Sequence, residues 1–183
     1  MKSICLCLSV LFFAGPLHAQ ISLPKAKDLQ KKVEAAAAQT GDIAYKAARE
    51  AFNKTVKDIP FPYNSSELNL TDPKYKVAGV NVDAFMKNTL IPVLGKLVAL
   101  LPADKQVTIT GHASKKGTEE ASGPFQGNIA LSKARAEALV KYITANSSLS
   151  AERFKVVAAG SSQPLPGADP ASDGNCRAAL IME

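Results

Sequence analysis

The fold is decided by two stretches of sequence, Gln106-Val-Thr-Ile-Thr-Gly111 and Ile129-Ala-Leu-Ser-Lys-Ala-Arg-Ala-Glu-Ala-Leu-Val-Lys-Tyr-Ile-Thr-Ala145. The first alternates apolar and hydroxylated residues and stops at a glycine, which is typical of a strand. The second places its larger apolar residues on one helical face and its charged residues elsewhere, which predicts an amphipathic helix. A strand followed by a helix indicates a layered α/β fold.

Further elements are expected on both sides of this pair. Upstream, residues 59–63 predict an edge strand that contains two prolines, and residues 82–101 predict a helix that Pro92 kinks or divides. Downstream, short strands are expected at 154–160 and 177–182, with a loop rich in Pro, Gly and Ser between them. The order is βαβαββ, and it predicts an α/β (α+β) two-layer sandwich with helices packed on a mixed sheet.

Residues 20–58 are expected to form a helical segment or linker ahead of a domain at 59–183. Apolar residues recur at helical spacing in 25–39 and again at Ile43, Ala47 and Ala51, with Phe52 beside them, and Gly41 marks a break between the two runs. This predicts two amphipathic helices, or one interrupted helix, outside the main core. Because the apolar residues are small, these helices need a docking surface for stability, and a mobile spacer is the alternative.

The first 19 residues have the layout of a secretory signal peptide. Lys2 precedes an apolar run at 4–14, the helix-breaking pair Gly15-Pro16 follows, and cleavage is expected near Ala19. About 11 apolar residues are too few to span a bilayer, which takes about 20. We therefore expect an exported chain with no transmembrane segment in its mature form.

The remaining composition argues against catalysis and against metal binding. His112 is the one histidine and Cys176 the one cysteine beyond the expected signal peptide, which excludes a cluster of His or Cys ligands and an intrachain disulfide. Cys176 is expected in the core, with pairing to a partner as the alternative. The sequence contains none of the common nucleophile or phosphate-binding motifs, so we expect no enzyme activity, no metal and no cofactor.

The basic balance of the chain first indicates a polyanion as partner. Lys and Arg number 22 against 16 Asp and Glu, a formal net charge of +6. Nucleic-acid binding, however, needs a basic patch with stacking aromatics or a groove-reading helix. The lysines of 25–57 are spread over helix faces without interleaved aromatics, so we expect no nucleic-acid partner.

The second half of the chain resembles the OmpA-like domain family over about residues 61–183. The specific motifs are Gly111-His112, Asn128-x-x-Leu131-Ser132-x-x-Arg135-Ala136, Ala159-Gly160 and Asn175-Cys-Arg177, with Phe61-Pro-Tyr63-Asn64 upstream. The resemblance implies a non-catalytic module that tethers a component of the bacterial envelope to peptidoglycan. It also implies a place in the periplasm, either free or peripheral to the outer membrane.

The resemblance further implies which residues bind the stem peptide of peptidoglycan. Arg135 occupies the position of an arginine that binds a carboxylate through two parallel hydrogen bonds. Asn128 is a ligand contact or a helix cap, and Asn64 is a polar contact or a turn residue. His112 is structural or positions the ligand, and Arg177 contacts ligand carboxylates or braces the sheet edge.

The most informative departure from the family is Ser114. The family has an aspartate there, which pairs with an ammonium group of the ligand, whereas this chain has Ser114 followed by Lys115 and Lys116. Of the two charged groups that would hold the carboxylate and the ammonium of the ligand (the clamp), the one for the ammonium is therefore missing, unless Glu119 or Glu120 folds back to replace it. The alternative function is a degenerate OmpA-like domain that has lost peptidoglycan binding. Such a domain would act as a structural or protein-interaction unit of the envelope through residues 25–58.

Overall fold

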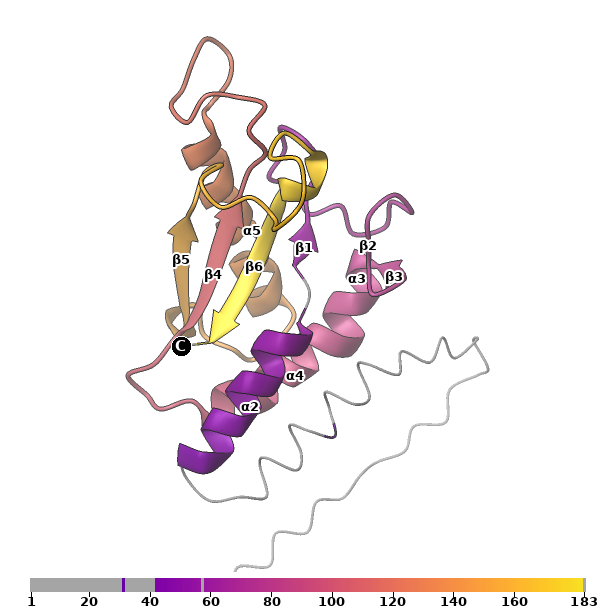
Figure 1. Ribbon diagram of the computed structural model, residues 1–183. Helices are drawn as coiled ribbons and strands as arrows, with labels where there is room; N and C mark the ends of the chain where they lie inside the picture. The colour runs from indigo at the N-terminus through magenta and orange to yellow at the C-terminus, as the bar shows by residue number, and fades with distance from the viewer. Residues whose placement is uncertain (1–30, 32–41, 57, 183) are drawn as a thin grey trace, which may run out of the picture.

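The computed structural model describes residue 31, residues 42–56 and residues 58–182 (Figure 1). The expected signal peptide with its cleavage site, and the expected first helix at 25–39, lie outside these residues except for Lys31. No helix within the described residues is long and apolar enough to cross a membrane.

The main elements follow the predicted order, with short additions between them. In chain order they are α2 (Asp42–Thr55), β1 (Ile59–Pro60), β2 (Lys76–Val77), β3 (Val80–Asn81), α3 (Val82–Phe85), η1 (Met86–Leu90), α4 (Ile91–Leu100), β4 (Val107–His112), α5 (Asn128–Ala145), η2 (Ala151–Arg153), β5 (Phe154–Ala158), η3 (Asp173–Asn175) and β6 (Arg177–Met182).

Four strands form one mixed sheet in the order β1-β6-β4-β5. β4 is parallel to β5 and antiparallel to β6, and β1 is antiparallel to β6. α5 connects the parallel pair and packs on β4, β5 and β6, behind the sheet in Figure 1. The side chains of Val107, Ile109 and Leu180 point into the core on that face. The predicted α/β sandwich with a mixed sheet is confirmed.

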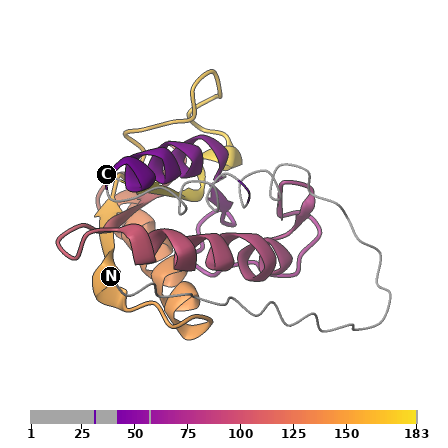
Figure 2. The same ribbon diagram turned by 90° about the horizontal axis from the view of Figure 1, so that it is seen from below.

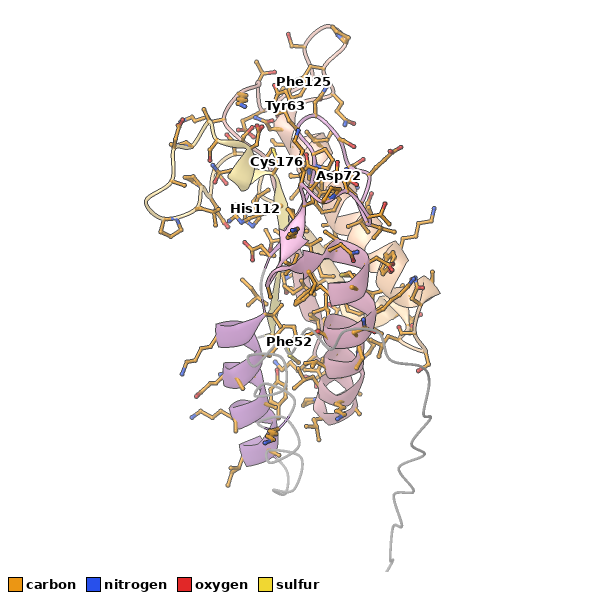
Figure 3. All side chains as sticks on the ribbon, turned by 90° about the vertical axis from the view of Figure 1, so that its right-hand side faces the viewer. Phe52, Tyr63, Asp72, His112, Phe125 and Cys176 are labelled. Atoms are coloured by element: carbon orange, nitrogen blue, oxygen red, sulfur yellow. The ribbon has the colours of Figure 1, made fainter. Side chains whose placement is uncertain are left out.

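The helix α2 differs from the expectation in its buried face. Ala44, Ala48 and Phe52 are buried, whereas Ile43 is 69% exposed. The predicted face of Ile43, Ala47 and Ala51 is therefore wrong, although Phe52 beside it is buried, since small apolar residues occur on several sides of this helix. The predicted position of this helix outside the main core is also wrong. α2 is part of the core and lies beside α4, as Figures 1 and 2 show, with Phe52 directed inward (Figure 3).

The side chain of Asn53 joins α2 to the end of β6. Its Nδ2 donates a hydrogen bond of 2.9 Å to the Met182 carbonyl, and its Oδ1 accepts one of 3.0 Å from the Met182 N–H. The amide thus supplies both bonds that a neighbouring strand would have supplied. α2 is consequently fixed to the sheet by hydrogen bonds as well as by apolar packing.

The helical stretch 82–100 continues through Pro92, with right-handed helical φ and ψ at Leu90 and Ile91, so the predicted division of the helix there is wrong. Pro92, which has no N–H to donate, lies in the first turn of α4, directly after a turn of different hydrogen bonding. The turn before it is a π-helix, and the N–H of Ile91 reaches back five residues to the carbonyl of Met86. The wider turn changes the helical register just ahead of the proline.

The contact between β4 and α5 is closest at Gly111. A Cβ atom built on Gly111 would lie 1.8 Å from the carbonyl oxygen of Ser132, so only glycine fits there. The hydroxyl of Ser132 accepts a hydrogen bond of 3.0 Å from the N–H of Gly160, which follows β5. One serine on α5 therefore meets the ends of both parallel strands.

We expect Gly111→Ala to lower the free energy of unfolding by about 3 kcal/mol or more, because the added methyl group forces the helix away from the strand. Gly95→Ala is the control, since a Cβ at Gly95 has no atom within 4 Å. That variant should gain about 0.5–1 kcal/mol from helix propensity. Urea unfolding of both variants checks the prediction, and equal stability of the two would contradict the packing described here.

Candidate functional site

Arg135, on α5, is buried at the end of the molecule where strand β4 ends. Its side chain is fully buried, with 0% exposure. Nε donates to the carbonyl of Ser65 at 2.9 Å, Nη1 to that of His112 at 2.8 Å, and Nη2 to that of Pro62 at 2.8 Å. Burial lowers the pKa of Arg135. The guanidinium thus ties the turn at 62–65 to the end of β4.

Phe61 and Cys176 complete the surroundings of this guanidinium. The Phe61 ring centroid lies 5.8 Å from its Cζ, a distance at which a cation–π attraction operates. Cys176 is a free, buried cysteine whose side chain interacts with Arg135. Its burial agrees with the expected core position. Arg135 is therefore held by carbonyl dipoles, a ring face and a sulfur atom, and by no carboxylate among the described residues.

Asn128 and Ser114 are also buried, each with 2% exposure. The expectation that Asn128 caps the helix is wrong, because Gly127, with φ of 90°, occupies the cap position and no side chain bonds there. Asn128 is the first residue of α5, and its Nδ2 donates to the carbonyl of Gly117 at 3.0 Å. It braces the loop that contains Ser114.

Exposed groups surround the buried ones at this end. Asn64 is exposed in a turn with φ of 52°, a backbone conformation that asparagine tolerates. Lys116 Nζ lies 2.6 Å from a carboxylate oxygen of Asp173 and 5.0 Å from the centroid of the Tyr63 ring. Lys116 therefore joins the turn at 62–65 to the loop before β6, a link that was missed because nothing in the sequence pairs positions so far apart.

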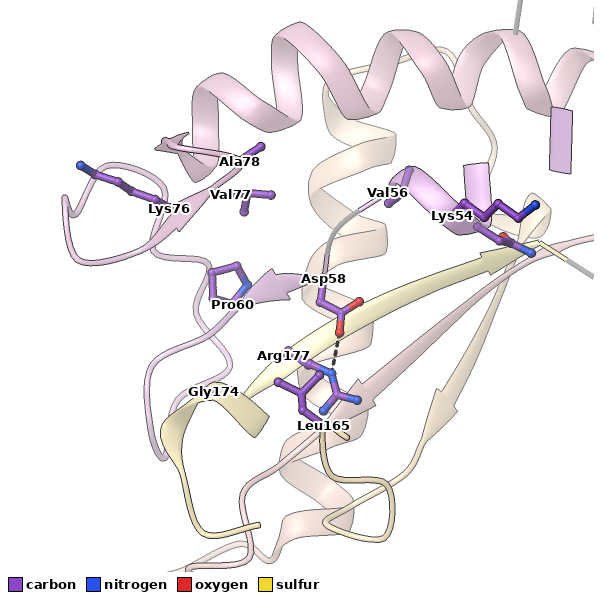
Figure 4. Close-up of a pocket in the computed structure, with 11 residues that line it drawn as sticks. Lys54, Val56, Asp58, Pro60, Lys76, Val77, Ala78, Leu165, Gly174 and Arg177 are labelled. Carbon is purple, nitrogen blue, oxygen red and sulfur yellow. Dashed lines mark hydrogen bonds and ion pairs between the residues drawn. The ribbon is translucent and has the colours of Figure 1, made fainter. Parts of the chain in front are cut away.

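His112 and Arg177 form a second group on the opposite face of the sheet. They pair across β4 and β6, next to Gly111 and Ala178, whose pair faces α5. Arg177 Nε lies 2.6 Å from Asp58 Oδ2, and Nη2 donates to the Gln163 carbonyl at 3.2 Å (Figure 4). The structure thus brings Arg135, Asn128, Ser114 and Asn64 to one end and places the side chains of His112 and Arg177 apart from them.

His112 is uncharged at neutral pH in this environment. Its ring is buried, and Nδ1 has no hydrogen-bond partner among the residues that the structure describes. Burial, with a smaller effect of the nearby Arg177 charge, lowers the pKa of His112 to about 4. A histidine with this pKa is a weak base near pH 7, so it is poorly suited to take a proton from a nucleophile.

Glu119 does not stand free to replace the missing aspartate. Its carboxylate accepts hydrogen bonds from the N–H and the hydroxyl of Ser161, just beyond β5. Glu120 is exposed. Within the part of the chain that the structure describes, no three His, Cys, Asp or Glu side chains gather in a way that could hold a metal ion.

A family model described as the OmpA family matches residues 80–176, more than half of the chain. Among solved structures, the chain is similar to the OmpA-like domain of FopA1 from Francisella tularensis (22% identity, 69% of this chain and 72% of that one, TM-score 0.46). It is also similar to the peptidoglycan-associated lipoprotein of Burkholderia pseudomallei (20% identity, 70% and 91%, TM-score 0.46). A third similar structure is the C-terminal domain of Helicobacter pylori MotB (15% identity, 70% of this chain and 86% of that one, TM-score 0.49). No curated protein sequence matches the chain.

We expect Arg135→Met to lower the free energy of unfolding by about 3 kcal/mol or more, because three carbonyl oxygens lose a charged donor. Lys133→Met is the control on the same helix, since the Lys133 side chain is 63% exposed. Its effect should stay within about 0.5 kcal/mol. Chemical denaturation measures both, and a near-neutral Arg135→Met would show that the three hydrogen bonds do not stabilise the fold.

We also expect a histidine-dependent loss of stability in acid. The pKa of His112 is about 4 in the folded chain against 6.5 for the free side chain. The unfolded chain therefore binds a proton first, and stability falls as pH drops from 6.5 to about 4, by ~1–3 kcal/mol in all. In His112→Gln this part of the pH dependence should vanish in denaturant titrations. An unchanged slope would assign the acid sensitivity to other groups.

Proposed function

The chain belongs to the OmpA family, and we propose from this that it is a non-catalytic module that associates with peptidoglycan in the bacterial envelope. One observation supports the proposal above others. The family motif residue Arg135 lies beneath the point where the turn at 62–65 and the end of β4 meet. The loops at this end are therefore held in a fixed arrangement that a stem peptide can recognise.

In this proposal Arg135 positions the site and the exposed groups above it meet the ligand. All three nitrogens of the guanidinium already donate to carbonyl oxygens, and the side chain is inaccessible. Lys115 and Lys116 are exposed on the adjoining loop, where Lys116 also pairs with Asp173, and ammonium groups attract the carboxylates of a stem peptide. Asn64 offers an amide in the turn that Arg135 holds. Binding of this kind weakens as salt screens the charges.

The site differs from the family pattern at the position that would bind the ammonium group of the ligand. Ser114 offers a neutral hydrogen bond, worth about 0.5–1.5 kcal/mol, where a carboxylate would give about 1.5–3 kcal/mol. The neighbouring lysines also repel a positive charge. We therefore propose recognition of carboxylates without a matched ammonium site, and affinity below that of a complete clamp.

The proposed place of action is the periplasm, either free or at the inner side of the outer membrane. The layout of residues 1–19 as a signal peptide with cleavage near Ala19 supports export. No catalytic step belongs to the proposal, because the buried, weakly basic His112 offers no activated nucleophile.

The second candidate function is a degenerate OmpA-like unit that binds an envelope protein instead of peptidoglycan. The complete burial of Arg135 and the serine at position 114 favour it. In this case the partner surface lies on the N-terminal segment 25–58. Since α2 packs into the core, we propose that the folded unit includes Asp42–Thr55, and that a partner contacts the exposed side of α2, which includes Ile43.

Co-sedimentation with purified sacculi tests the proposal. The mature chain should sediment at low salt and be released by added salt, since the exposed groups of the site are lysines. The double variant Lys115→Glu/Lys116→Glu should lose about tenfold or more in affinity, because each reversal replaces an attraction by a repulsion. Ser114→Asp should bind more tightly than the wild-type chain, because it supplies the missing carboxylate.

Lys133→Glu/Lys141→Glu is the matched control, with the same change of charge at two exposed positions on α5. It should bind as the wild-type chain does. Circular dichroism of each variant separates loss of binding from loss of fold, which matters most for the buried Ser114. If folded wild-type chain and folded Ser114→Asp both stay in the supernatant at low salt, the second candidate function replaces the first.

A further inference from the structure

Asp173 brings a carboxylate into the proposed peptidoglycan site. It is the first residue of η3, the short turn before β6, and lies outside the family motifs. Its Oδ1 lies 2.6 Å from Nζ of Lys116, and 62% of the Asp173 side chain and 41% of the Lys116 side chain are exposed. The hydrogen bond to Asp173 raises the pKa of Lys116, so the lysine is charged at neutral pH. The free chain thus has an ion pair at the surface where the ligand binds in our proposal.

The Lys116 ammonium has a second partner that does not depend on Asp173. Its Nζ lies 5.0 Å from the centroid of the Tyr63 ring, where a cation–π attraction operates. Tyr63 belongs to the turn at 62–65, in which two carbonyl oxygens accept hydrogen bonds from Arg135. Without its contact to Asp173, the ammonium would therefore keep a partner inside the site.

The backbone holds the two loops together independently of this ion pair. The N–H of Lys115 donates to the carbonyl of Pro170 at 2.8 Å. Asn175, with 0% exposure, donates to the carbonyl of Asp169 at 2.9 Å and thereby shapes the loop ahead of η3. Exchange of partners at Lys116 therefore needs only the movement of exposed side chains.

An exposed ion pair of this kind is easily exchanged. Both partners contact water, side-chain freedom is lost on pairing, and such pairs contribute little to stability. A carboxylate that arrives from solvent replaces one ammonium–carboxylate contact by another, so displacement of Asp173 costs little. While Asp173 remains in place, however, its negative charge repels the incoming carboxylate. Asp173 therefore competes with any such group for Lys116.

Asp169 provides a comparison within the same loop. It is exposed, its Oδ1 accepts a hydrogen bond of 2.9 Å from the N–H of Ala171, and it has no ion pair among the described residues. Loss of its charge therefore changes the electrostatic potential of the loop without freeing a lysine. An asparagine in its place keeps the accepting oxygen.

We propose that Asp173 sets the affinity of the site, because its carboxylate occupies the Lys116 ammonium until a carboxylate of the ligand displaces it. Competition of this kind rests on the proposed function, since the stem peptide supplies the ligand carboxylate. The proton stays on Lys116 throughout, and the ammonium stays beside the Tyr63 ring. The free chain thus binds carboxylates less tightly than its two lysines alone would allow.

Titration of the full chain with N-acetylalanine, and with its C-terminal amide as the uncharged control, tests the competition. Binding is followed by the ring resonances of Tyr63 and the side-chain resonances of Lys116. Asp173→Asn should bind the acid about threefold or more tightly than the wild-type chain, because the competing charge is lost. The amide should gain nothing. Asp169→Asn loses the same charge from the same loop and should stay within about twofold of the wild-type chain.

The background Lys116→Met separates competition from a general effect of charge. With no ammonium at this position to compete for, Asp173→Asn should change the remaining affinity for the acid by less than about 1.5-fold. A gain of equal size in both backgrounds, equal affinity of the wild-type chain and Asp173→Asn, or no shift at Tyr63 at about 100 mM acid would overturn the proposal.

Co-sedimentation with sacculi separates this proposal from the proposed function. Folded Asp173→Asn should stay bound to sacculi at a higher salt concentration than the wild-type chain. If the acid titrations give the expected result and no variant sediments, peptidoglycan is not the ligand, and a carboxylate from another source competes with Asp173. If the chain sediments and Asp173→Asn gains nothing in either measurement, the proposed function stands and the competition is wrong.

Discussion

The close contact of α5 with β4 at Gly111 is the constraint on which the rest of the structure depends. Only glycine allows the Ser132 carbonyl to come so near the strand. At this distance the Ser132 hydroxyl reaches Gly160, and Arg135, one turn further along the helix, reaches the carbonyl of His112. Four of the residues by which the family is recognised therefore belong to this one contact between helix and sheet: Gly111, Ser132, Arg135 and Gly160. Their first effect is to fix the geometry of the loops at that end.

This arrangement changes what an arginine in a family motif implies. The resemblance to the family implies that Arg135 binds a ligand carboxylate, but its donors are directed at backbone carbonyl oxygens and its side chain is buried. We therefore propose that positioning and ligand contact belong to different residues. Recognition in our proposal falls to exposed side chains such as Lys116 and Asn64, whose positions follow from this contact between helix and sheet. Ser114 is neutral and Lys116 is paired with Asp173, so Lys115 is the lysine of this loop that no ion pair among the described residues neutralises, which favours a carboxylate over a zwitterion as ligand.

Much of the fold could be predicted because its main elements have strong periodicity. β4 and α5 have clear patterns, and the order of strands and helices leaves few topologies. The buried face of α2 could not be predicted, since alanines on several sides of the helix make several of its faces equally apolar. The pair of Asp58 and Arg177 and the link from Lys116 to Asp173 join positions 119 and 57 residues apart. Such contacts depend on the three-dimensional arrangement, and no local sequence pattern predicts them.

Our central proposal is that peptidoglycan binds to the loops that Arg135 holds together. Nuclear magnetic resonance of the full chain, titrated with a soluble muropeptide, tests it most directly. We expect shifts concentrated in the amides of residues 62–65 and 113–117, with those of α2 unchanged. We also expect the Arg135 Nε–H to keep its hydrogen-bonded position. Shifts located elsewhere in the chain, or no shift in a folded chain at saturating muropeptide, would contradict it.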